Sequence, residues 1–265
     1  MFLFVPIYLS LLFGSSFSQD CGQKRRGESR IIGGEEATPH SWPWQLSLRF
    51  NGSHACGASL LTPQWALTAA HCLVKSRDPK DYRLVFGAHY VKNDGDILGL
   101  SRIIVHEGFH VDHFKHDFAL LKIVRPVRLS NKVQTICLAR GEQIKPGTKC
   151  YISGWGRFDP KKPKTPSSWL KQSLVPIVDN KSCLRKNGHI TDIPDDVMVC
   201  VGGQGSTICN GDSGGPLMCE ENGRWFLRGV ASWMTSYSCP VDTYSVFARV
   251  STHVDWIRNK MQRNS

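Results

Sequence analysis

Three short segments of this 265-residue chain contain side chains whose types suit acyl transfer. Residues 67–72 contain His71, residues 117–123 begin with Asp117, and residues 209–216 contain Ser213. A serine hydroxyl is a weak nucleophile at neutral pH and needs a base beside it, and an imidazole has a suitable pKa. A buried carboxylate can hold the imidazole in one tautomer, and backbone N–H groups near glycines can face the developing oxyanion. The three segments therefore predict a nucleophile, its base and an orienting carboxylate.

Each segment alone also has an ordinary structural interpretation. A histidine beside a cysteine is usually structural, an aspartate before an apolar run often starts a strand, and the run around Ser213 suits a turn. Their order His, Asp, Ser along one cysteine-rich chain is far more specific. On these motifs the sequence resembles the chymotrypsin-like (trypsin-fold) serine endopeptidases from residue 31 to the C-terminal segment.

The resemblance implies a role for each of these residues in cleaving protein or peptide substrates. Ser213 corresponds to the nucleophile, His71 to the general base and then acid, and Asp117 to the residue that orients His71. The backbone N–H groups of Gly211 and Ser213 correspond to the oxyanion hole. The sequence carries no substitution at these positions, so the resemblance implies an intact serine-type endopeptidase, a hydrolase.

The elements that must position these residues are short. Strand-like runs separated by turn residues extend over residues 43–250 and predict an all-β body, as two antiparallel barrels or a large sandwich. Helical periodicity is clear only at the end, in Val254, Ile257 and Met261, where Thr252 and Asp255 resemble a capping box. The resemblance implies two six-stranded β-barrels with the active site between them and a C-terminal α-helix.

Ten cysteines without a C-x-x-C pair predict five disulfides in an oxidising compartment. The apolar segment 2–13 is too short to cross a bilayer and small residues follow it, so we interpret residues 1–18 as a signal peptide. No later segment suits a membrane helix or a lipid anchor. We expect a secreted, extracellular protein, and storage in secretory granules is compatible with this.

The charge balance is basic, with 33 Lys and Arg against 22 Asp and Glu, a net charge of +11. Such an excess suits a heparin-like polyanion or only a well-solvated surface, and we expect no nucleic-acid partner. A competing hypothesis from another class follows: a weakly active or non-catalytic protease-fold protein that binds polyanions or microbial surfaces. The intact His71, Asp117 and Ser213 favour the enzyme, which we expect to be a monomer.

The composition changes at Arg30-Ile31, which marks either a processing site or an exposed linker. The resemblance implies a zymogen: a trypsin-like protease cuts after Arg30, and the new Ile31 ammonium pairs with Asp212. His54 and Ser47 correspond to zymogen partners of that aspartate, although His54 also suits an ordinary core histidine. We therefore divide the chain into a signal peptide, an activation propeptide and a trypsin-like peptidase domain, at residues 1–18, 19–30 and 31–265.

The resemblance also pairs the cysteines, which the sequence alone does not. It implies a propeptide tether and four bridges within the body: Cys21–Cys137, Cys56–Cys72, Cys150–Cys219, Cys183–Cys200 and Cys209–Cys239. The propeptide should therefore remain attached after cleavage.

The specificity pocket departs from that of trypsin. Its floor corresponds to Thr207 instead of an aspartate, which disfavours Lys or Arg substrates. Its walls correspond to Met234 and Ser245 instead of glycines, with Ile208 facing inward, so we predict elastase-like cleavage after small or medium aliphatic residues. Ser232 and Trp233 complete the expected pocket. Together with Met234 they form a segment that should pair with the substrate backbone.

Two glycosylation sequons begin at Asn51 and Asn180. The calcium loop of trypsin relatives corresponds to residues 88–96, where Ala88 replaces a ligand, so we predict no metal. We expect no cofactor, and serine protease inhibitors are expected partners.

Overall fold

The structure is a computed structural model that describes residues 21–24, 35–139, 141, 143–157, 166–187, 192–203, 205–236, 238–240 and 242–265. The predicted signal peptide, the predicted cleavage pair Arg30 and Ile31, and all of the predicted propeptide except 21–24 lie outside the described residues.

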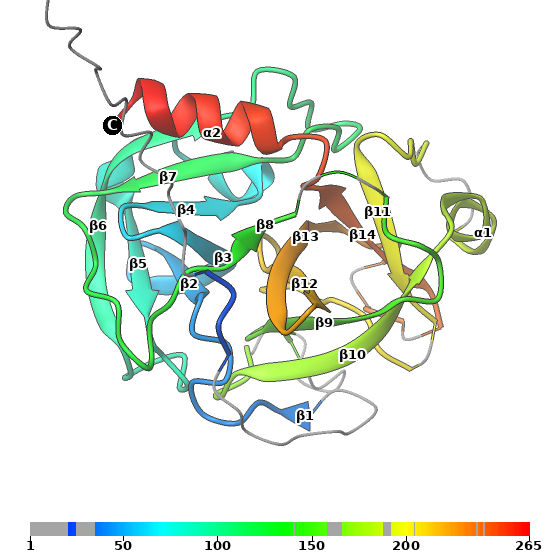
Figure 1. The fold of residues 1–265 in the computed structure, drawn as a ribbon, viewed down its shortest axis with the longest axis horizontal. Helices are drawn as coiled ribbons and strands as arrows, with labels where there is room; N and C mark the ends of the chain where they lie inside the picture. The colour runs from blue at the N-terminus through cyan, green and yellow to red at the C-terminus, as the bar shows by residue number, and fades with distance from the viewer. Residues whose placement is uncertain are drawn as a thin grey trace, which may run out of the picture.

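Two closed antiparallel β-barrels lie side by side (Figure 1). The first barrel closes in the order β2-β3-β4-β7-β6-β5. Apolar residues at alternate positions fill it, such as Leu46 and Leu48 of β2 and Leu84 and Phe86 of β5. Its strands are β2 (Gln45–Phe50), β3 (Ser53–Thr62), β4 (Trp65–Thr68), β5 (Tyr82–Phe86), β6 (Asp96–Val105) and β7 (Ala119–Ile123).

The second barrel runs β10-β11-β14-β13-β12-β9 and is closed by pairing of β9 with β10. Two short strands extend its sheet: β1 (Glu35–Glu36) beside β10 and β8 (Cys137–Leu138) parallel to β13. The barrel strands are β9 (Lys149–Gly154), β10 (Lys171–Val178), β11 (Met198–Gly202), β12 (Pro216–Glu221), β13 (Arg224–Trp233) and β14 (Tyr244–Arg249). Two six-stranded barrels are confirmed, and the alternative of a large sandwich is wrong.

The predicted C-terminal helix is present as α2 (Val254–Arg263), and it lies over the first barrel although it follows the second in sequence (Figure 1). Val254 and Ile257 form its buried face. The predicted capping box is wrong, because Thr252 donates its hydroxyl hydrogen to the Asp196 carbonyl and His253 begins the helix without a side-chain cap.

The described residues also contain three helices shorter than α2. In α1 (Asn180–Lys186), which the sequence analysis missed, the Asp179 carboxylate accepts a hydrogen bond from the Ser182 N–H and caps the first turn. The other two are the 3-10 helices η1 (Ala70–Leu73) and η2 (Pro79–Asp81). Of these, η1 matters for function because it carries His71.

Direct bonds hold the barrels together. Trp42 donates from Nε1 to Gln172 Oε1 at 2.7 Å, and both side chains are buried. The Gly57 N–H, on β3, donates to the Ser213 carbonyl at 2.7 Å. Residues from both barrels can therefore form one site with fixed geometry.

The five disulfides join the same pairs that the family resemblance implies. Four lie within the body: Cys56–Cys72, Cys150–Cys219, Cys183–Cys200 and Cys209–Cys239. The fifth, Cys21–Cys137, ties residues 21–24 to the second barrel, where Gly22 exchanges backbone hydrogen bonds with Thr135 and Trp225. The described part of the predicted propeptide is thus anchored to the body.

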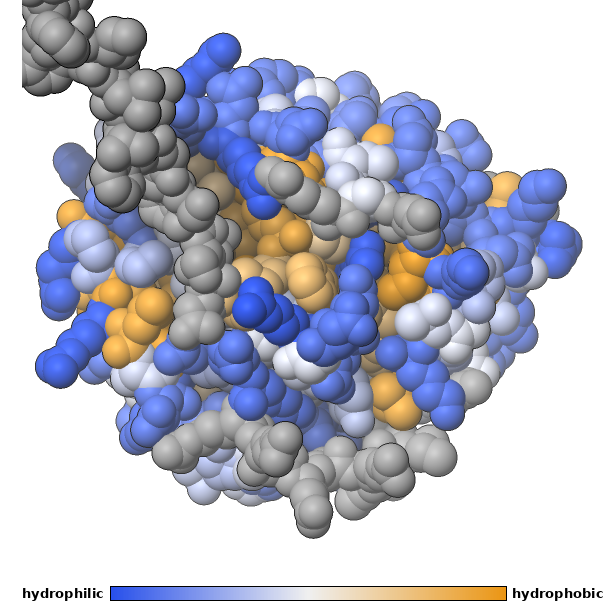
Figure 2. Space-filling model, viewed as in Figure 1, coloured by the Kyte–Doolittle hydropathy of each residue, from blue (hydrophilic) through white to orange (hydrophobic). Residues whose placement is uncertain are grey.

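Most of the face shown in Figure 2 is hydrophilic, with the apolar residues in separate patches. Among the helices of the described residues, none has both the length and the apolar character that crossing a membrane requires.

Candidate active site

His71 and Asp117 are joined by two hydrogen bonds. The His71 backbone N–H donates to Asp117 Oδ1 at 2.9 Å, and His71 Nδ1 donates to Oδ2 at 2.7 Å. Asp117 has no exposed surface, whereas the His71 side chain is 19% exposed. A carboxylate oxygen accepts hydrogen bonds, so the hydrogen of the imidazole lies on Nδ1 and the lone pair on Nε2.

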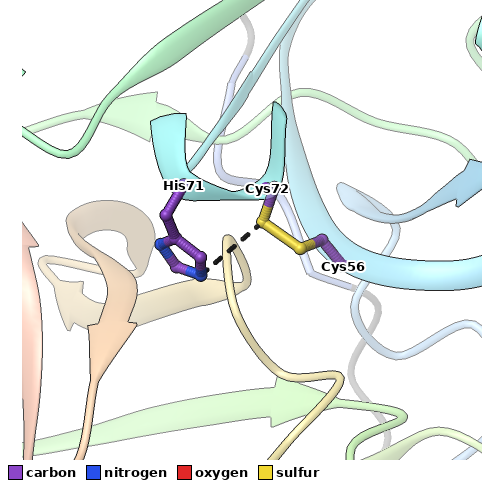
Figure 3. Close-up of side chains that lie close together, drawn as sticks. All are labelled: Cys56, His71 and Cys72. Atoms are coloured by element: carbon purple, nitrogen blue, oxygen red, sulfur yellow. Dashed lines mark hydrogen bonds between the residues drawn. A yellow bond between two sulfur atoms is a disulfide. The ribbon is translucent and has the colours of Figure 1, made fainter. Parts of the chain in front are cut away.

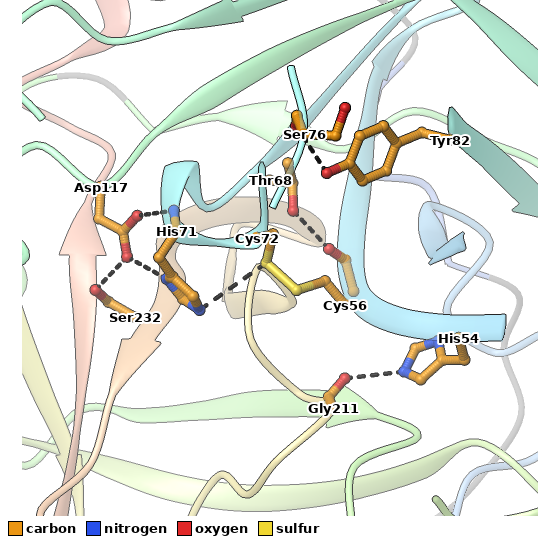
Figure 4. The surroundings of a disulfide bond; sticks show 11 residues. His54, Cys56, Thr68, His71, Cys72, Ser76, Tyr82, Asp117, Gly211 and Ser232 are labelled. Atoms are coloured by element: carbon orange, nitrogen blue, oxygen red, sulfur yellow. Dashed lines mark hydrogen bonds and ion pairs between the residues drawn. A yellow bond between two sulfur atoms is a disulfide. The ribbon is translucent and has the colours of Figure 1, made fainter. Parts of the chain in front are cut away.

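Ser232 completes the surroundings of Asp117, a contact that the sequence analysis did not foresee. Its hydroxyl donates to Asp117 Oδ2 at 2.6 Å (Figure 4). Ser232 lies at a register shift between β13 and β14, and a bulge of this kind re-aims a side chain. Its hydroxyl therefore supports Asp117, while it was predicted only as a pocket residue.

The other ring nitrogen of His71 faces a disulfide. Its Nε2 atom lies 3.9 Å from Cys72 Sγ, in the bridge to Cys56 (Figure 3). The described hydrogen bonds include none from the Ser213 hydroxyl to His71. Catalytic hydrogen bonds often tighten only when substrate binds, so this arrangement is compatible with Ser213 as the nucleophile.

The turn that carries Ser213 presents two backbone donors. Gly211 has φ +99°, a value that favours glycine. Its carbonyl accepts a hydrogen bond from His54 Nε2 at 2.9 Å, which holds the peptide in place (Figure 4). Neither Gly211 nor Ser213 donates its N–H to another residue in the described ranges. Two N–H groups are therefore available for an oxyanion.

His54 is a neutral structural group. Burial lowers its pKa to about 4, so Nδ1 accepts from the Ser47 hydroxyl at 2.8 Å while Nε2 donates to Gly211. The structure thus places His54 against the carbonyl of Gly211 and not against the carboxylate of Asp212.

Asp212 faces a cavity of about 220 Å³ behind the turn. Its carboxylate accepts from the N–H groups of Gly156 at 2.7 Å and Cys209 at 2.9 Å. A Cβ atom on Gly156 would lie 2.1 Å from Oδ2, so this approach requires glycine. Desolvation by the surrounding protein raises the pKa of Asp212 to about 6, because no cation among the described residues pairs with it.

Three of the predicted pocket residues, Thr207, Ile208 and Ser245, are joined by hydrogen bonds. Ser245 is buried, and its Oγ atom bonds the Thr207 hydroxyl and accepts from the Ile208 N–H, both at 2.9 Å. Met234 is half-buried and packs against the apolar cluster that contains Ile208. Trp233 is buried in the neighbouring cluster. Met234 therefore packs in the same apolar region as Ile208.

The two sequons differ in exposure. Asn51 is exposed in the turn between β2 and β3. Asn180 is buried, and its Nδ2 atom, the atom to which a glycan would attach, donates to the carbonyls of Ile193 and Met198. In this fold the sequon at Asn180 therefore leaves no exposed nitrogen for a glycan, whereas the sequon at Asn51 does.

Two β-barrels with a hydrogen-bonded Asp–His pair and a serine on a glycine-rich turn define the class of chymotrypsin-like serine proteases. Comparison with known proteins agrees. Residues 31–257 match the Trypsin family model. Over 248 residues, 88% of this chain and 90% of the relative, the sequence is 38% identical to chymotrypsin-C of Bos taurus. The chain belongs to the trypsin family and is a serine-type endopeptidase.

Proposed function

We propose that this protein is a secreted endopeptidase, made as a zymogen, that cleaves peptide bonds through an acyl-enzyme on Ser213. The double hydrogen bond between Asp117 and His71 is the observation that carries the proposal. The buried carboxylate of Asp117 accepts both bonds and so fixes the imidazole tautomer, which is the requirement for a histidine base.

In the proposed reaction, His71 Nε2 takes the hydroxyl proton of Ser213 as the oxygen attacks the substrate carbonyl. The N–H groups of Gly211 and Ser213 donate to the oxyanion that forms. His71 then gives its proton to the leaving amine, and a water molecule releases the acyl group by the same steps in reverse. Asp117 stabilises the imidazolium without taking its proton.

Activation follows from the surroundings of Asp212. Cleavage after Arg30 by a trypsin-like protease would free the Ile31 ammonium, four residues before Glu35. Glu35 pairs in the sheet with Gln172, which lines the cavity of Asp212, and four extended residues span about 13 Å. A desolvated carboxylate without a cation favours such a partner. The ammonium would then lock the turn that carries the oxyanion donors.

We propose that the enzyme prefers small or medium aliphatic residues, as elastase-like members do. Thr207 offers no charge for Lys or Arg substrates, and its hydroxyl is already bonded to Ser245. Met234 packs against the apolar cluster that contains Ile208, which supports a shallow apolar pocket. Preference should be graded, since one methylene in such a pocket changes the free energy by about 1–3 kcal/mol.

Export of the protein is supported by its five disulfides, since these persist in oxidising compartments. Serine protease inhibitors that present a peptide to the same cleft are expected partners.

The test is labelling by a fluorophosphonate before and after cleavage of purified protein at Arg30. We expect rapid labelling of the cleaved wild type, no labelling of Ser213→Ala, and slow labelling of the uncleaved chain. An Arg30→Gln variant is the matched control, because the activating protease cannot cut it there and its labelling should stay as slow as that of the uncleaved chain. Absence of labelling in correctly cleaved, folded wild type would refute the enzyme and favour the polyanion-binding alternative.

A further inference from the structure

Three histidines that take no part in the triad form a cluster. His106 follows β6, His116 directly precedes Asp117, and His253 is the N-cap of α2. One ring nitrogen of each lies within 4.8 Å of the others. The spacing of these residues in sequence matches no metal motif, so only the fold brings them together.

Hydrogen bonds fix the tautomers of His253 and His116. The Arg249 carbonyl can only accept, so His253 Nδ1 at 2.9 Å carries the hydrogen. The lone pair of His253 Nε2 therefore points to His116 Nδ1, 2.8 Å away. A histidine whose second nitrogen donates to a backbone carbonyl is the usual arrangement of a metal ligand. His253 is thus oriented as a ligand would be.

Two features of the surroundings bear on metal binding. The neighbouring carboxylate of Glu107 is already engaged by Trp256 and Lys260. His106 and His116 keep partial exposure, which leaves a path for an ion from solvent.

We propose that His106, His116 and His253 form a binding site for a zinc-like divalent metal ion, and that binding slows catalysis by displacing Asp117. Three imidazoles with a fourth position for water suit zinc. Zn–N bonds of 2.0–2.1 Å in a tetrahedron separate the nitrogens by about 3.3 Å. The His116–His253 pair must therefore open by about half an ångström, while the ring of half-buried His106 tilts inward and releases the N–H of Gly108.

The movement reaches Asp117 through the backbone. His116 has φ +52°, a conformation that a non-glycine residue keeps only when its surroundings hold it. Its carbonyl accepts from the Phe118 N–H at 2.7 Å, so residues 116–118 form one tight turn around Asp117. A shift of His116 toward a metal therefore disturbs the alignment of Asp117 with His71. This second part of the inference rests on the proposed function.

The metal site is tested without catalysis, by calorimetric titration of ZnCl₂ into the uncleaved chain carrying Ser213→Ala. We expect one site that weakens at least tenfold in His106→Ala and in His253→Gln. His106 is half-buried, so its variant remains informative if His253→Gln fails to fold. The matched control is His110→Ala with His113→Ala, an exposed histidine pair with ring centroids 5.4 Å apart. Zinc binding that is absent, or lost only in this control, would overturn the site.

The coupling is tested by measuring kcat and KM of the cleaved enzyme with and without zinc. We expect a several-fold fall in kcat, a nearly unchanged KM, and no zinc effect in His106→Ala. A zinc-insensitive kcat in wild type that binds zinc by calorimetry would overturn the coupling. If the cleaved enzyme hydrolyses nothing, the proposed function fails, and the calorimetry still decides the metal site.

Discussion

Ser232 and Asp117 are 115 residues apart in sequence, yet the Ser232 hydroxyl donates to the same carboxylate oxygen, Oδ2, as His71 Nδ1. Asp117 thus accepts three hydrogen bonds from two residues while it is completely buried. One barrel supplies His71 and the other supplies Ser232, so the contact fixes the position of Asp117 between them.

We predict that Ser232→Ala lowers kcat/KM by about tenfold, since a hydrogen bond to a charged group contributes about 1.5–3 kcal/mol and the two bonds from His71 remain. The measurement is steady-state hydrolysis of a peptide ester by the cleaved enzyme. Ser101→Ala, an exposed serine on β6, is the control and should keep full activity. Wild-type kinetics in Ser232→Ala would show that its hydroxyl does not hold Asp117 in the working enzyme.

Removal of the charge on Asp117 has a larger expected effect. Asp117→Asn places an amide against His71 and allows the wrong tautomer of the imidazole. The equivalent substitution lowers kcat about 10⁴-fold in a serine protease of this family. We expect a similar loss here, measured as the rate of fluorophosphonate labelling, with an unchanged circular dichroism spectrum. Labelling within tenfold of wild type would mean that His71 is oriented by another group.

We propose that Met234 limits the size of the pocket. Met234→Gly should then raise the ratio of cleavage after Phe to cleavage after Val by about tenfold or more, because it removes a side chain that packs against the apolar cluster containing Ile208. A peptide-library profile of the cleaved enzyme gives this ratio. Met261→Ala, on α2, is the control and should leave the profile unchanged. An unaltered profile in Met234→Gly would place the determinant of specificity elsewhere.

The strand-like runs predicted an all-β body, with two barrels or a large sandwich left open. The family resemblance, carried by the local His, Asp and Ser motifs, implied the two barrels that the structure has. Sequence patterns did not suffice where the outcome depends on contacts made at long range. Thr252 has the spacing of a capping residue, but its hydroxyl bonds the Asp196 carbonyl, and Asn180 has the pattern of a sequon but is buried. The role of Ser232 was missed for the same reason, since a bulge in β13 turns it toward Asp117.

Lys24 anchors the described part of the predicted propeptide. Its ammonium lies 3.7 Å from the ring centroid of Trp42, with Trp225 and Tyr151 within 6 Å, and burial lowers its pKa to about 8. A desolvated cation over aromatic faces contributes about 2 kcal/mol. We predict that Lys24→Met, which keeps the apolar stem, lowers Tm by a few degrees. Lys132→Met, at an exposed lysine, should leave Tm unchanged. Equal Tm values for the two variants would contradict the anchoring role of Lys24.

Asp212 should make stability depend on pH in opposite ways before and after cleavage. In the uncleaved chain its pKa is about 6, above the ordinary value of 3.8, so the folded state binds the proton more tightly. Its contribution to stability is full below pH 3.8 and is lost as pH rises toward 6, by roughly 2–3 kcal/mol. In the cleaved enzyme, pairing with the Ile31 ammonium should lower the pKa, so that stability is instead lost as pH falls.

The measurement is urea unfolding of both forms between pH 4 and pH 7, each compared with Asp212→Asn. Asparagine cannot titrate, so the difference between wild type and variant isolates the contribution of Asp212 even though the variant starts from another baseline. We expect the difference to slope downward with pH before cleavage and upward after it. Equal slopes in the two forms would mean that the Ile31 ammonium does not reach Asp212, and a flat difference before cleavage would mean that the carboxylate is solvated in the uncleaved chain.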